Sequence, residues 1–415
     1  MSEVVRKAAE AKAAAVHLAM ASTVKKNEAL LAIAAALTAQ QAEVLAANTK
    51  DLEAFHQQPG YTTALHDRLA LNEERIAGMV EGLQQLAALP DPIGEVTGMS
   101  VRPNGLQVGQ VRVPLGVVGI IYEARPNVTV DAASLALKAG NAVVLRGGSE
   151  AINSNKALVK ILRQAVESVG LPAAVITIIE DTDRAAVHEL MRLNENLDVL
   201  IPRGGAALIK TVVENSSVPV IATGTGICHT FVDATADVAM ATAIAINAKT
   251  TRPAVCNALE TLLVHQRVAD QFLPHMLPQF FAAGVEVRGC EITQQYDQRV
   301  AAAKEDDWST EYLDLIISIK VVASLDEAIN HIKRYGTGHS EAIITALYDN
   351  AREFQARVDA AAVYVNASTR FTDGFEFGLG AEMGISTQKL HARGPMGLTA
   401  LTSTKFIING NGQIR

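Results

Sequence analysis

The chain has 415 residues, of which 49% are hydrophobic and 19% charged, and its formal net charge is −8. This composition is typical of a soluble globular protein with room for two or three domains. The negative charge argues against a nucleic-acid-binding surface, which needs a basic patch or stripe. The cysteines Cys228, Cys256 and Cys290 lack the paired spacing of a zinc site or a disulfide framework, which fits a reducing cytoplasm.

The N-terminal part, residues 3–90, has a helical composition. Alanine, leucine, glutamate and lysine dominate it, and no proline or glycine occurs before Pro59. Ser22 and Thr23 predict a break between the first two helices. Glu10 and Lys12 interrupt any apolar core of a signal peptide, and we expect no membrane span.

From residue 99 the pattern changes to strands. Residues 100–113 alternate around Asn104 and Gly105, which predicts a β-hairpin. Apolar runs separated by helical stretches follow, which is typical of a parallel sheet covered on both faces. The strands expected from these runs lie at residues 116–121, 142–145, 174–179, 199–201 and 218–222. The alternation resumes after residue 233, with a helix at 238–248 and a strand at 259–264, so we expect two α/β lobes.

Cys256 is the most informative residue. The polar loop at residues 249–253 brings its thiol directly ahead of the largely apolar run at residues 258–264. Arg252 lies close in sequence, and a nearby cation keeps a thiol partly in its nucleophilic thiolate form. The alternative is that Cys256 is a small buried hydrophobe. Cys228 and His229 form a weaker candidate pair, because adjacent side chains on a strand point to opposite faces.

Glycine pairs follow two of the predicted strands. Arg146 precedes Gly147-Gly148, and Arg203 precedes Gly204-Gly205 with a helical stretch behind it. Backbone N–H groups at a helix start bind anions, although such a pair is also common in a simple turn. Neither pair belongs to a G-x-G-x-x-G dinucleotide fingerprint, so the sequence does not support a conventional Rossmann motif.

Three arginines lie in polar loops at the ends of apolar segments: Arg125, Arg252 and Arg370. The planar guanidinium suits carboxylate and phosphate groups. Each arginine alone is compatible with a surface ion pair, but the three comparable positions favour an anionic substrate. No spacing of His, Cys, Asp or Glu indicates a metal site.

Five stretches together resemble the γ-glutamyl phosphate reductase family of the aldehyde dehydrogenase superfamily. They are VPLGVVGIIYEARPNVTVD at residues 113–131, GNAVVLRGG at 140–148, LIPRGG at 200–205, YVNASTRFTDG at 364–374 and STQKLHARGPMG at 386–397. The resemblance runs over nearly the whole chain. It implies NADPH-dependent reduction of L-glutamate 5-phosphate to L-glutamate 5-semialdehyde and phosphate, in proline biosynthesis.

The resemblance also implies roles for single residues. Cys256 matches the nucleophile that forms a thioester, and Asn127 matches the side-chain amide that holds the developing oxyanion. Arg146 falls where relatives carry a cofactor-binding lysine, and it suits the 2′-phosphate of NADPH. Gly204 and Gly205 match the loop near the pyrophosphate.

Two positions depart from the pattern of relatives. Glu311 matches the acid that binds the nicotinamide ribose, but the residues around it differ from the usual Glu-x-Phe-Gly-Pro. Oxidising relatives carry a glutamate general base in the stretch that corresponds to residues 222–226, and here that stretch is ATGTG, without an acid. Because a reductase does not need to activate water, this absence favours reduction.

The resemblance implies an α/β fold with two Rossmann-like lobes of the aldehyde dehydrogenase type. Residues 1–99 and 114–232 would form a cofactor-binding domain, residues 233–378 a catalytic domain, and residues 100–113 and 379–415 a small β arm for oligomerisation. Exposed strand edges in the arm would pair with another subunit, so we expect a homo-oligomer. We also expect a functional coupling to a glutamate 5-kinase, and neither nucleic acid nor membrane as a partner.

Two other functions remain open at this point. One is an oxidising aldehyde dehydrogenase that acts on a small anionic aldehyde, against which the missing general base argues. The other is an alanine-rich helical scaffold without catalysis, which predicts that no cofactor binds.

Overall fold

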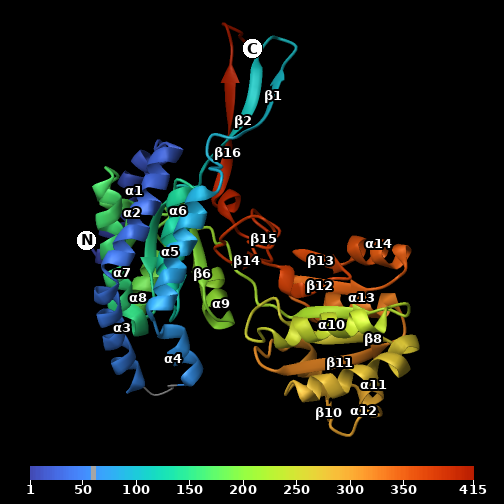
Figure 1. The fold of residues 1–415 in the computed structure, drawn as a ribbon. Coiled ribbons are helices and arrows are strands. Elements are labelled where there is room, and N and C mark those ends of the chain that lie inside the picture. Colours follow the sequence, from blue (N-terminus) through green and yellow to red (C-terminus); the bar gives the residue numbers. More distant parts are fainter. Residues whose placement is uncertain (58–61) are drawn as a thin grey trace. The chain divides into compact units, whose positions relative to one another are not determined.

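The computed structural model describes residues 1–57 and 62–415 and groups them into two compact units (Figure 1). The first unit comprises Met1–Thr223, Gly378–Gly384 and Met396–Arg415, and the second comprises Gly224–Phe377 and Ile385–Pro395. Parallel sheets in both units confirm the predicted α/β class. The assignment of cofactor binding, catalysis and oligomerisation to particular segments remains a prediction.

The first unit begins with five helices, and several of them start at a side-chain cap. They are α1 (Glu3–Ala19), α2 (Thr23–Ala39), α3 (Gln41–His56), α4 (Thr63–Leu69) and α5 (Glu73–Ala88). The Ser22 side chain accepts a hydrogen bond from the Lys25 N–H at 3.2 Å. This cap satisfies an N–H that the first turn of α2 leaves without a partner, and it explains the break predicted at Ser22. Pro59 and Gly60 lie outside the described residues.

A four-stranded parallel sheet forms the centre of the first unit, in the order β5-β4-β3-β6. Every residue of β3 and β4 is buried, as expected for strands covered on both faces. The strands are β3 (Val117–Tyr122), β4 (Ala142–Arg146), β5 (Ile176–Ile178) and β6 (Val199–Arg203). The helices between and after them are α6 (Pro126–Lys138), α7 (Ile152–Ser168), α8 (Arg184–Leu190) and α9 (Ala206–Asn215), with short 3₁₀ turns at Ser149–Ala151 and Ala173–Val175.

The prediction of a strand at residues 218–222 is wrong. Only Val220 forms a bridge there, to Leu200 of β6, before the chain leaves the sheet. The apolar side chains of Val218 and Ile221 are buried, but the segment pairs with β6 only through this one bridge and forms no strand.

The predicted hairpin is confirmed as part of an antiparallel sheet of three strands in the order β1-β2-β16. They are β1 (Val96–Val101), β2 (Gln107–Pro114) and β16 (Thr402–Asn409). Gly105 adopts φ +88°, a conformation that glycine tolerates better than other residues, and it closes the turn between β1 and β2. Short 3₁₀ helix Leu398–Leu401 leads into β16.

The second unit contains a seven-stranded sheet in the order β10-β9-β11-β8-β7-β12-β13, with every pairing parallel. Its strands are β7 (Cys228–Val232), β8 (Leu259–His265), β9 (Glu286–Gly289), β10 (Ala301–Ala302), β11 (Ile316–Val322), β12 (Ser340–Ile344) and β13 (Ala362–Val365). Its helices are α10 (Val238–Thr250), α11 (Gln266–Ala282), α12 (Glu291–Gln294), α13 (Leu325–Tyr335) and α14 (Tyr348–Arg357). Smaller elements are 3₁₀ turns at Glu305–Ser309 and Thr369–Phe371 and the pair β14 (Ile385–Ser386) and β15 (Gly394–Pro395).

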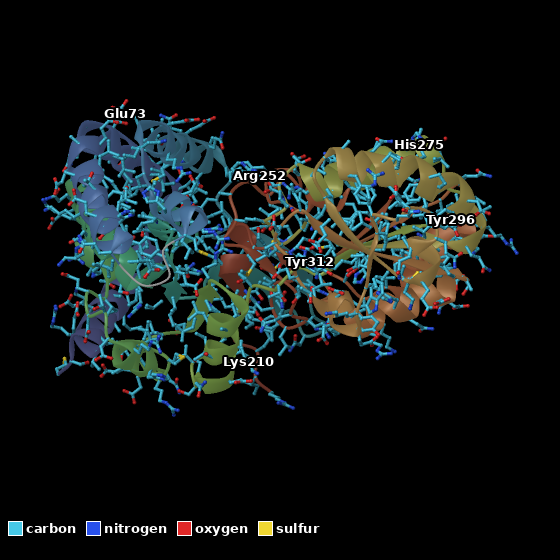
Figure 2. All side chains as sticks on the ribbon, turned by 90° about the horizontal axis from the view of Figure 1, so that it is seen from below. Glu73, Lys210, Arg252, His275, Tyr296 and Tyr312 are labelled. Carbon is cyan, nitrogen blue, oxygen red and sulfur yellow. The ribbon has the colours of Figure 1, made fainter. Side chains whose placement is uncertain are left out.

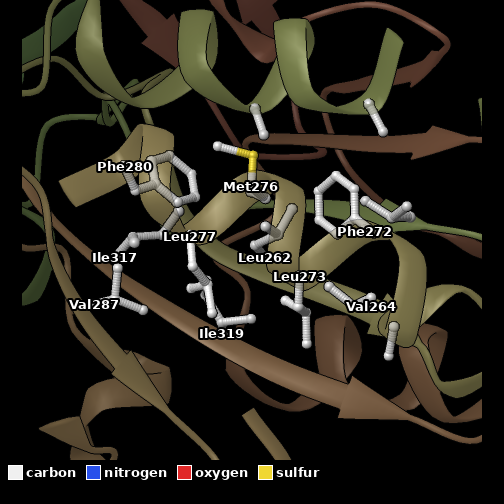
Figure 3. Packing of buried hydrophobic residues seen from close by; sticks show 14 of the residues in the cluster. Leu262, Val264, Phe272, Leu273, Met276, Leu277, Phe280, Val287, Ile317 and Ile319 are labelled. Carbon is white, nitrogen blue, oxygen red and sulfur yellow. The ribbon is translucent and has the colours of Figure 1, made fainter. Parts of the chain in front are cut away.

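The core of the second unit shows how the sequence pattern fixes this packing (Figure 3). Phe272, Met276 and Phe280 recur every four residues along α11, so they lie on one face of that helix. Leu262 of β8 and Ile319 of β11 belong to the same buried cluster. Burying such side chains stabilises the fold by about 1.5–3 kcal/mol each.

Among the described residues, no single helix is long and apolar enough to cross a membrane. The pair α2 and α3 meets the same criteria only when taken together across a bend of 69°, by length and composition.

Candidate active site

Cys256 lies in a turn of the second unit directly before β8, and its side chain is partly exposed. Gly226 passes so close that a Cβ atom built on it would lie 1.5 Å from the carbonyl oxygen of Cys256. Only glycine fits there, because any side chain would push the two backbone segments apart. The thiol is therefore carried by a tightly packed turn while remaining accessible.

Arg370 is tied to the same turn. Its guanidinium donates to the side-chain oxygen of Asn257, and the Asn257 amide donates to the carbonyls of Arg370 and Thr372 at 3.3 and 3.0 Å. The Thr369 hydroxyl donates to the Asn257 carbonyl at 2.7 Å. These bonds fix the turn at residues 369–372 beside the nucleophile candidate.

Arg370 lies near both Arg252 and Cys256. Burial lowers the pKa of Arg370, the positive charge of Arg252 lowers it further, and a negative charge on Cys256 raises it. Charges shift a pKa in this way only over short distances. In Figure 2, Arg252 and Tyr312 lie apart from His275 and Tyr296, which mark a different part of the second unit. The structure thus brings together three of the residues that the sequence singled out.

Cys228 does not compete for the role of nucleophile. It is completely buried, and burial followed by the charge of Glu341 raises the pKa of its thiol well above the ordinary value. Its sulfur donates to the carbonyl of Cys256 at 3.2 Å, so Cys228 supports the turn. His229 instead pairs with Glu341, with 3.0 Å between Nδ1 and Oε2. As expected, Cys228 and His229 have different partners.

Glu311 also belongs to this part of the second unit. Its carboxylate oxygen Oε1 accepts a hydrogen bond from the Gly226 N–H at 2.7 Å. Burial raises the pKa of Glu311, and the bond from Gly226 partly offsets that effect. Glu311 therefore contacts Gly226, which packs on the Cys256 carbonyl. The residues after Glu311 do not match the Glu-x-Phe-Gly-Pro pattern of relatives.

The remaining predicted residues belong to the first unit. Arg125 is exposed and precedes α6, whose first residue is Pro126, a favoured position for proline. The Asn127 amide donates to the Asp131 carboxylate at 3.1 Å, one turn further along α6. Asn127 is partly exposed, so its amide lies at the surface of the unit.

Arg146 is more buried than its predicted role requires. Its guanidinium donates to the carbonyls of Gly147 and Thr182 at 2.9 and 2.8 Å, and it is 8% exposed. Burial lowers the pKa of Arg146. Its Nε has no hydrogen-bond partner within the described part of the chain. Arg146 thus holds the loop after β5, and its remaining donor is buried.

Gly204 and Gly205 stand exposed at the start of α9. The Gly205 N–H donates to the carboxylate of Glu123 at 3.0 Å, and a Cβ on Gly204 would lie 2.5 Å from the same carboxyl carbon. This helix start therefore accommodates an anionic group, with the Glu123 carboxylate in the place of a ligand. A dinucleotide phosphate would take this N–H only after the Glu123 carboxylate moves away, because two anions repel each other at one donor.

Comparison with known proteins places these features in a family. The profile of the aldehyde dehydrogenase family matches residues 1–287. The γ-glutamyl phosphate reductase of Moorella thermoacetica is 63% identical over 413 residues, which cover 100% of this chain and 99% of that protein. The chain belongs to the γ-glutamyl phosphate reductase family. It is an oxidoreductase of the aldehyde dehydrogenase superfamily, which uses a nicotinamide cofactor.

Other relatives and solved structures agree with this family. The γ-glutamyl phosphate reductase of Carboxydothermus hydrogenoformans is 61% identical over 415 residues, with 100% of both chains covered. The crystal structure of γ-glutamyl phosphate reductase from Thermotoga maritima has 52% identity and a TM-score of 0.98, again with 100% of both chains covered. An acetylating aldehyde dehydrogenase from Geobacillus thermoglucosidasius, at 19% identity and a TM-score of 0.70 over 100% of this chain and 97% of that one, shares the fold.

Several residues that lie around Cys256 in this γ-glutamyl phosphate reductase family member were not singled out from the sequence. Lys249 and Glu260 form an ion pair at 2.7 Å behind the Cys256 turn, with side chains 0% and 1% exposed. Asn257 connects Cys256 to Arg370. The sequence does contain one indication for Glu260, which is a single charged residue inside an apolar strand. A charged residue in such a position is rarely buried without a partner.

Proposed function

We propose that this protein reduces L-glutamate 5-phosphate to L-glutamate 5-semialdehyde and phosphate with NADPH, as a step of proline biosynthesis. The observation that carries the proposal is the partly exposed Cys256 with Arg370 near it and Arg252 near Arg370. Full-length relatives named γ-glutamyl phosphate reductase support the identity of the substrate. In this proposal the arginines bind the anionic groups of the substrate, and the Cys256 thiol reacts with its acyl phosphate.

The chemistry assigned to Cys256 is nucleophilic catalysis. The thiolate attacks the acyl carbon, the bond from that carbon to the phosphate oxygen breaks, and inorganic phosphate leaves with the bonding electron pair. A thioester remains on Cys256. The positive charge of Arg370, which interacts with Cys256, offsets the charge of the incoming acyl phosphate.

Hydrogen-bond donors have to stabilise the oxygen of the acyl group as it gains charge. We assign this role to the Asn127 amide and to the backbone N–H of Cys256. The amide now donates to Asp131, and this bond fixes its orientation at the start of α6. When the acyl carbon accepts a hydride and the C–S bond breaks, the Cys256 thiolate is regenerated and the aldehyde leaves.

When bound, the reduced dinucleotide supplies that hydride. Gly204 and Gly205 would hold its pyrophosphate at the start of α9, where the Glu123 carboxylate already accepts from a backbone N–H. Arg146 would approach the 2′-phosphate that distinguishes NADPH from NADH, through the positive charge that suits an anion. Glu311 would accept from the nicotinamide ribose through the carboxylate oxygen that Gly226 does not use.

Trapping the thioester tests this function. The protein is mixed with acyl phosphate formed in place by glutamate, ATP and a glutamate kinase, without dinucleotide. Mass spectrometry of the intact chain and of its peptides should find one glutamyl group, on the peptide that contains Cys256. A glutamyl group on another residue, or none while added NADPH is still consumed, would refute the thioester route.

Replacing the proposed substrate arginines should lower kcat/KM for the acyl phosphate. We expect Arg125→Ala, Arg252→Ala and Arg370→Ala each to lose about 1.5–3 kcal/mol of transition-state binding, or about 10- to 150-fold, because charge-assisted hydrogen bonds are lost. The Kd for NADPH should barely change. Arg370→Ala also removes the bond to Asn257, so its thermal unfolding is measured as a control. If a variant has the same kcat/KM as the unsubstituted protein, that arginine does not bind the substrate.

The proposed homo-oligomer rests on the three-stranded sheet of β1, β2 and β16. Apolar side chains on its edge strands are exposed, among them Met99, Val101, Phe406 and Ile408. Exposed strand edges with apolar side chains favour pairing with another chain. Sedimentation velocity measures the assembly, and a monomer at micromolar concentration would contradict it.

The proposed reaction is the basis for two further proposals, a functional coupling to a glutamate 5-kinase and a cytoplasmic location.

A further inference from the structure

The ion pair between Lys249 and Glu260 has no role in the chemistry proposed above. Lys249 lies near the end of α10 and Glu260 near the start of β8, with 2.7 Å between Nζ and Oε2. Both side chains are essentially unexposed. Removing two charges from water costs several kcal/mol per ion, and their mutual attraction often fails to offset that cost. Stability alone is therefore a poor reason for this pair.

The second oxygen of Glu260 holds a strained turn. Oε1 accepts a hydrogen bond from the backbone N–H of Leu313 at 3.3 Å. Leu313 has φ +55°, in the left-handed region that a leucine rarely adopts. A conformation of this kind costs about 1–3 kcal/mol and persists only where neighbouring groups enforce it. Lys249 also lies 5.9 Å from the centre of the Tyr312 ring, in the same turn.

The strained turn carries Glu311, which connects it to the nucleophile. Glu311 accepts from the Gly226 N–H at 2.7 Å, and Gly226 packs on the Cys256 carbonyl without room for a Cβ. A continuous series of contacts therefore runs from Glu260 through Leu313, Glu311 and Gly226 to the turn of Cys256.

We propose that the Lys249–Glu260 pair is a positioning element of the active site, which holds the turn at residues 311–313 so that Glu311 keeps Gly226 against Cys256. The inference rests on the proposed role of Cys256 as the nucleophile. Lys249 keeps Glu260 in place, and neither residue touches the substrate.

The electrostatics of the pair agree with this role. Burial raises the pKa of Glu260 to about 7, whereas the charge of Lys249 opposes that rise. Burial also lowers the pKa of Lys249, and the charge of Glu260 opposes that change. Each partner's charge thus favours the ionised form of the other.

A double substitution separates positioning from stability. Lys249→Met combined with Glu260→Leu removes both charges and fills the space with apolar atoms, which in other buried pairs has been neutral or stabilising. The same change removes the acceptor of the Leu313 N–H. We expect a melting temperature near that of the unsubstituted protein, but at least 10-fold faster hydrogen exchange in peptides that cover residues 224–228 and 310–315. If the double variant does not fold, Lys249→Met with Glu260→Met, which likewise removes both charges and the acceptor of the Leu313 N–H, is measured in its place with the same expected exchange.

The first unit offers a matched control. Lys26 and Asp91 form a buried ion pair at 2.5 Å, with side chains 1% and 6% exposed, and Asp91 likewise accepts a backbone N–H, that of Ile93, at 3.0 Å. Lys26→Met with Asp91→Leu should leave exchange at residues 224–228 and 310–315 unchanged. The proposal is overturned if hydrogen exchange at residues 224–228 and 310–315 is equal in the two double variants. It is also overturned if the Lys249 and Glu260 variant exchanges there as slowly as the unsubstituted protein.

Kinetics provide a second, independent measurement. The Lys249 and Glu260 variant should lose about 10- to 100-fold in kcat/KM, whereas in a Glu311→Ala background the same double substitution should change kcat/KM by less than about 2-fold. Additive losses in the two backgrounds would show that the pair acts by another route and would overturn the proposal. If the unsubstituted protein does not reduce the acyl phosphate, the proposed function fails, and the exchange measurement still decides the positioning role.

Discussion

Replacing Cys256 by serine is expected to abolish turnover. A serine hydroxyl is not ionised at neutral pH, so the variant lacks the nucleophile that takes up the acyl group. We expect kcat to fall by at least about 10³-fold, in the range found when other enzymes lose a nucleophile. The steady-state oxidation of NADPH in the presence of the acyl phosphate measures this loss.

The other two cysteines provide matched controls for Cys256→Ser. Cys228→Ser preserves a donor to the Cys256 carbonyl, and Cys290 lies at the start of α12 with its sulfur 3.3 Å from the Thr293 hydroxyl. Both serine variants should retain substantial activity, and all three should bind NADPH and remain folded. Near-normal turnover by Cys256→Ser would show that the nucleophile is misassigned. Loss of activity by Cys228→Ser without unfolding would indicate the same error.

Phosphate should be essential for sustained turnover in the reverse direction. With glutamate 5-semialdehyde and NADP⁺, hydride transfer leaves an acyl group on Cys256, and only phosphate accepts it. Residues 222–226 contain no acid that could activate water for hydrolysis. Without phosphate we expect at most one NADPH per active site, and with phosphate we expect continuous NADPH formation, followed by absorbance.

The structure also identifies the residue to examine if phosphate proves dispensable. Glu311 lies against Gly226, and burial raises the pKa of its carboxyl, which makes it a stronger base. Sustained NADPH formation in phosphate-free buffer, with glutamate accumulating, would mean that a base activates water. Loss of that sustained activity in Glu311→Gln, with the burst of one NADPH per active site retained, would then assign the base to Glu311 and make the protein an oxidising aldehyde dehydrogenase.

Periodicity predicted most of the fold, because strands buried on both faces and amphipathic helices leave clear patterns. The run at residues 142–145 is apolar throughout, and β4 is buried at every position. Asn104 and Gly105 predicted the turn of the hairpin from local backbone preference alone. The apolar run at residues 218–222 suggested a full strand, but the segment contacts β6 through a single bridge, and burial of Val218 and Ile221 does not depend on a longer pairing.

The sequence singled out candidate site residues where a loop carries a chemically distinctive side chain. Arg252 and Arg370 were chosen in this way, and Arg370 lies near both Arg252 and Cys256, whereas their roles remain predictions. The supporting contacts were not predictable, because they join residues far apart in the sequence. Glu260 looked like one polar residue in an apolar strand, and its partners Lys249 and Leu313 become visible only after folding.

The oxidation of NADPH driven by the acyl phosphate tests the central claim most directly. The purified protein is mixed with NADPH, glutamate, ATP and a glutamate kinase, and absorbance is followed together with the release of phosphate and of the semialdehyde. The account predicts that NADPH oxidation starts only when all components are present, with one semialdehyde formed for each NADPH consumed. No oxidation under these conditions, by a folded protein that binds NADPH, would contradict it.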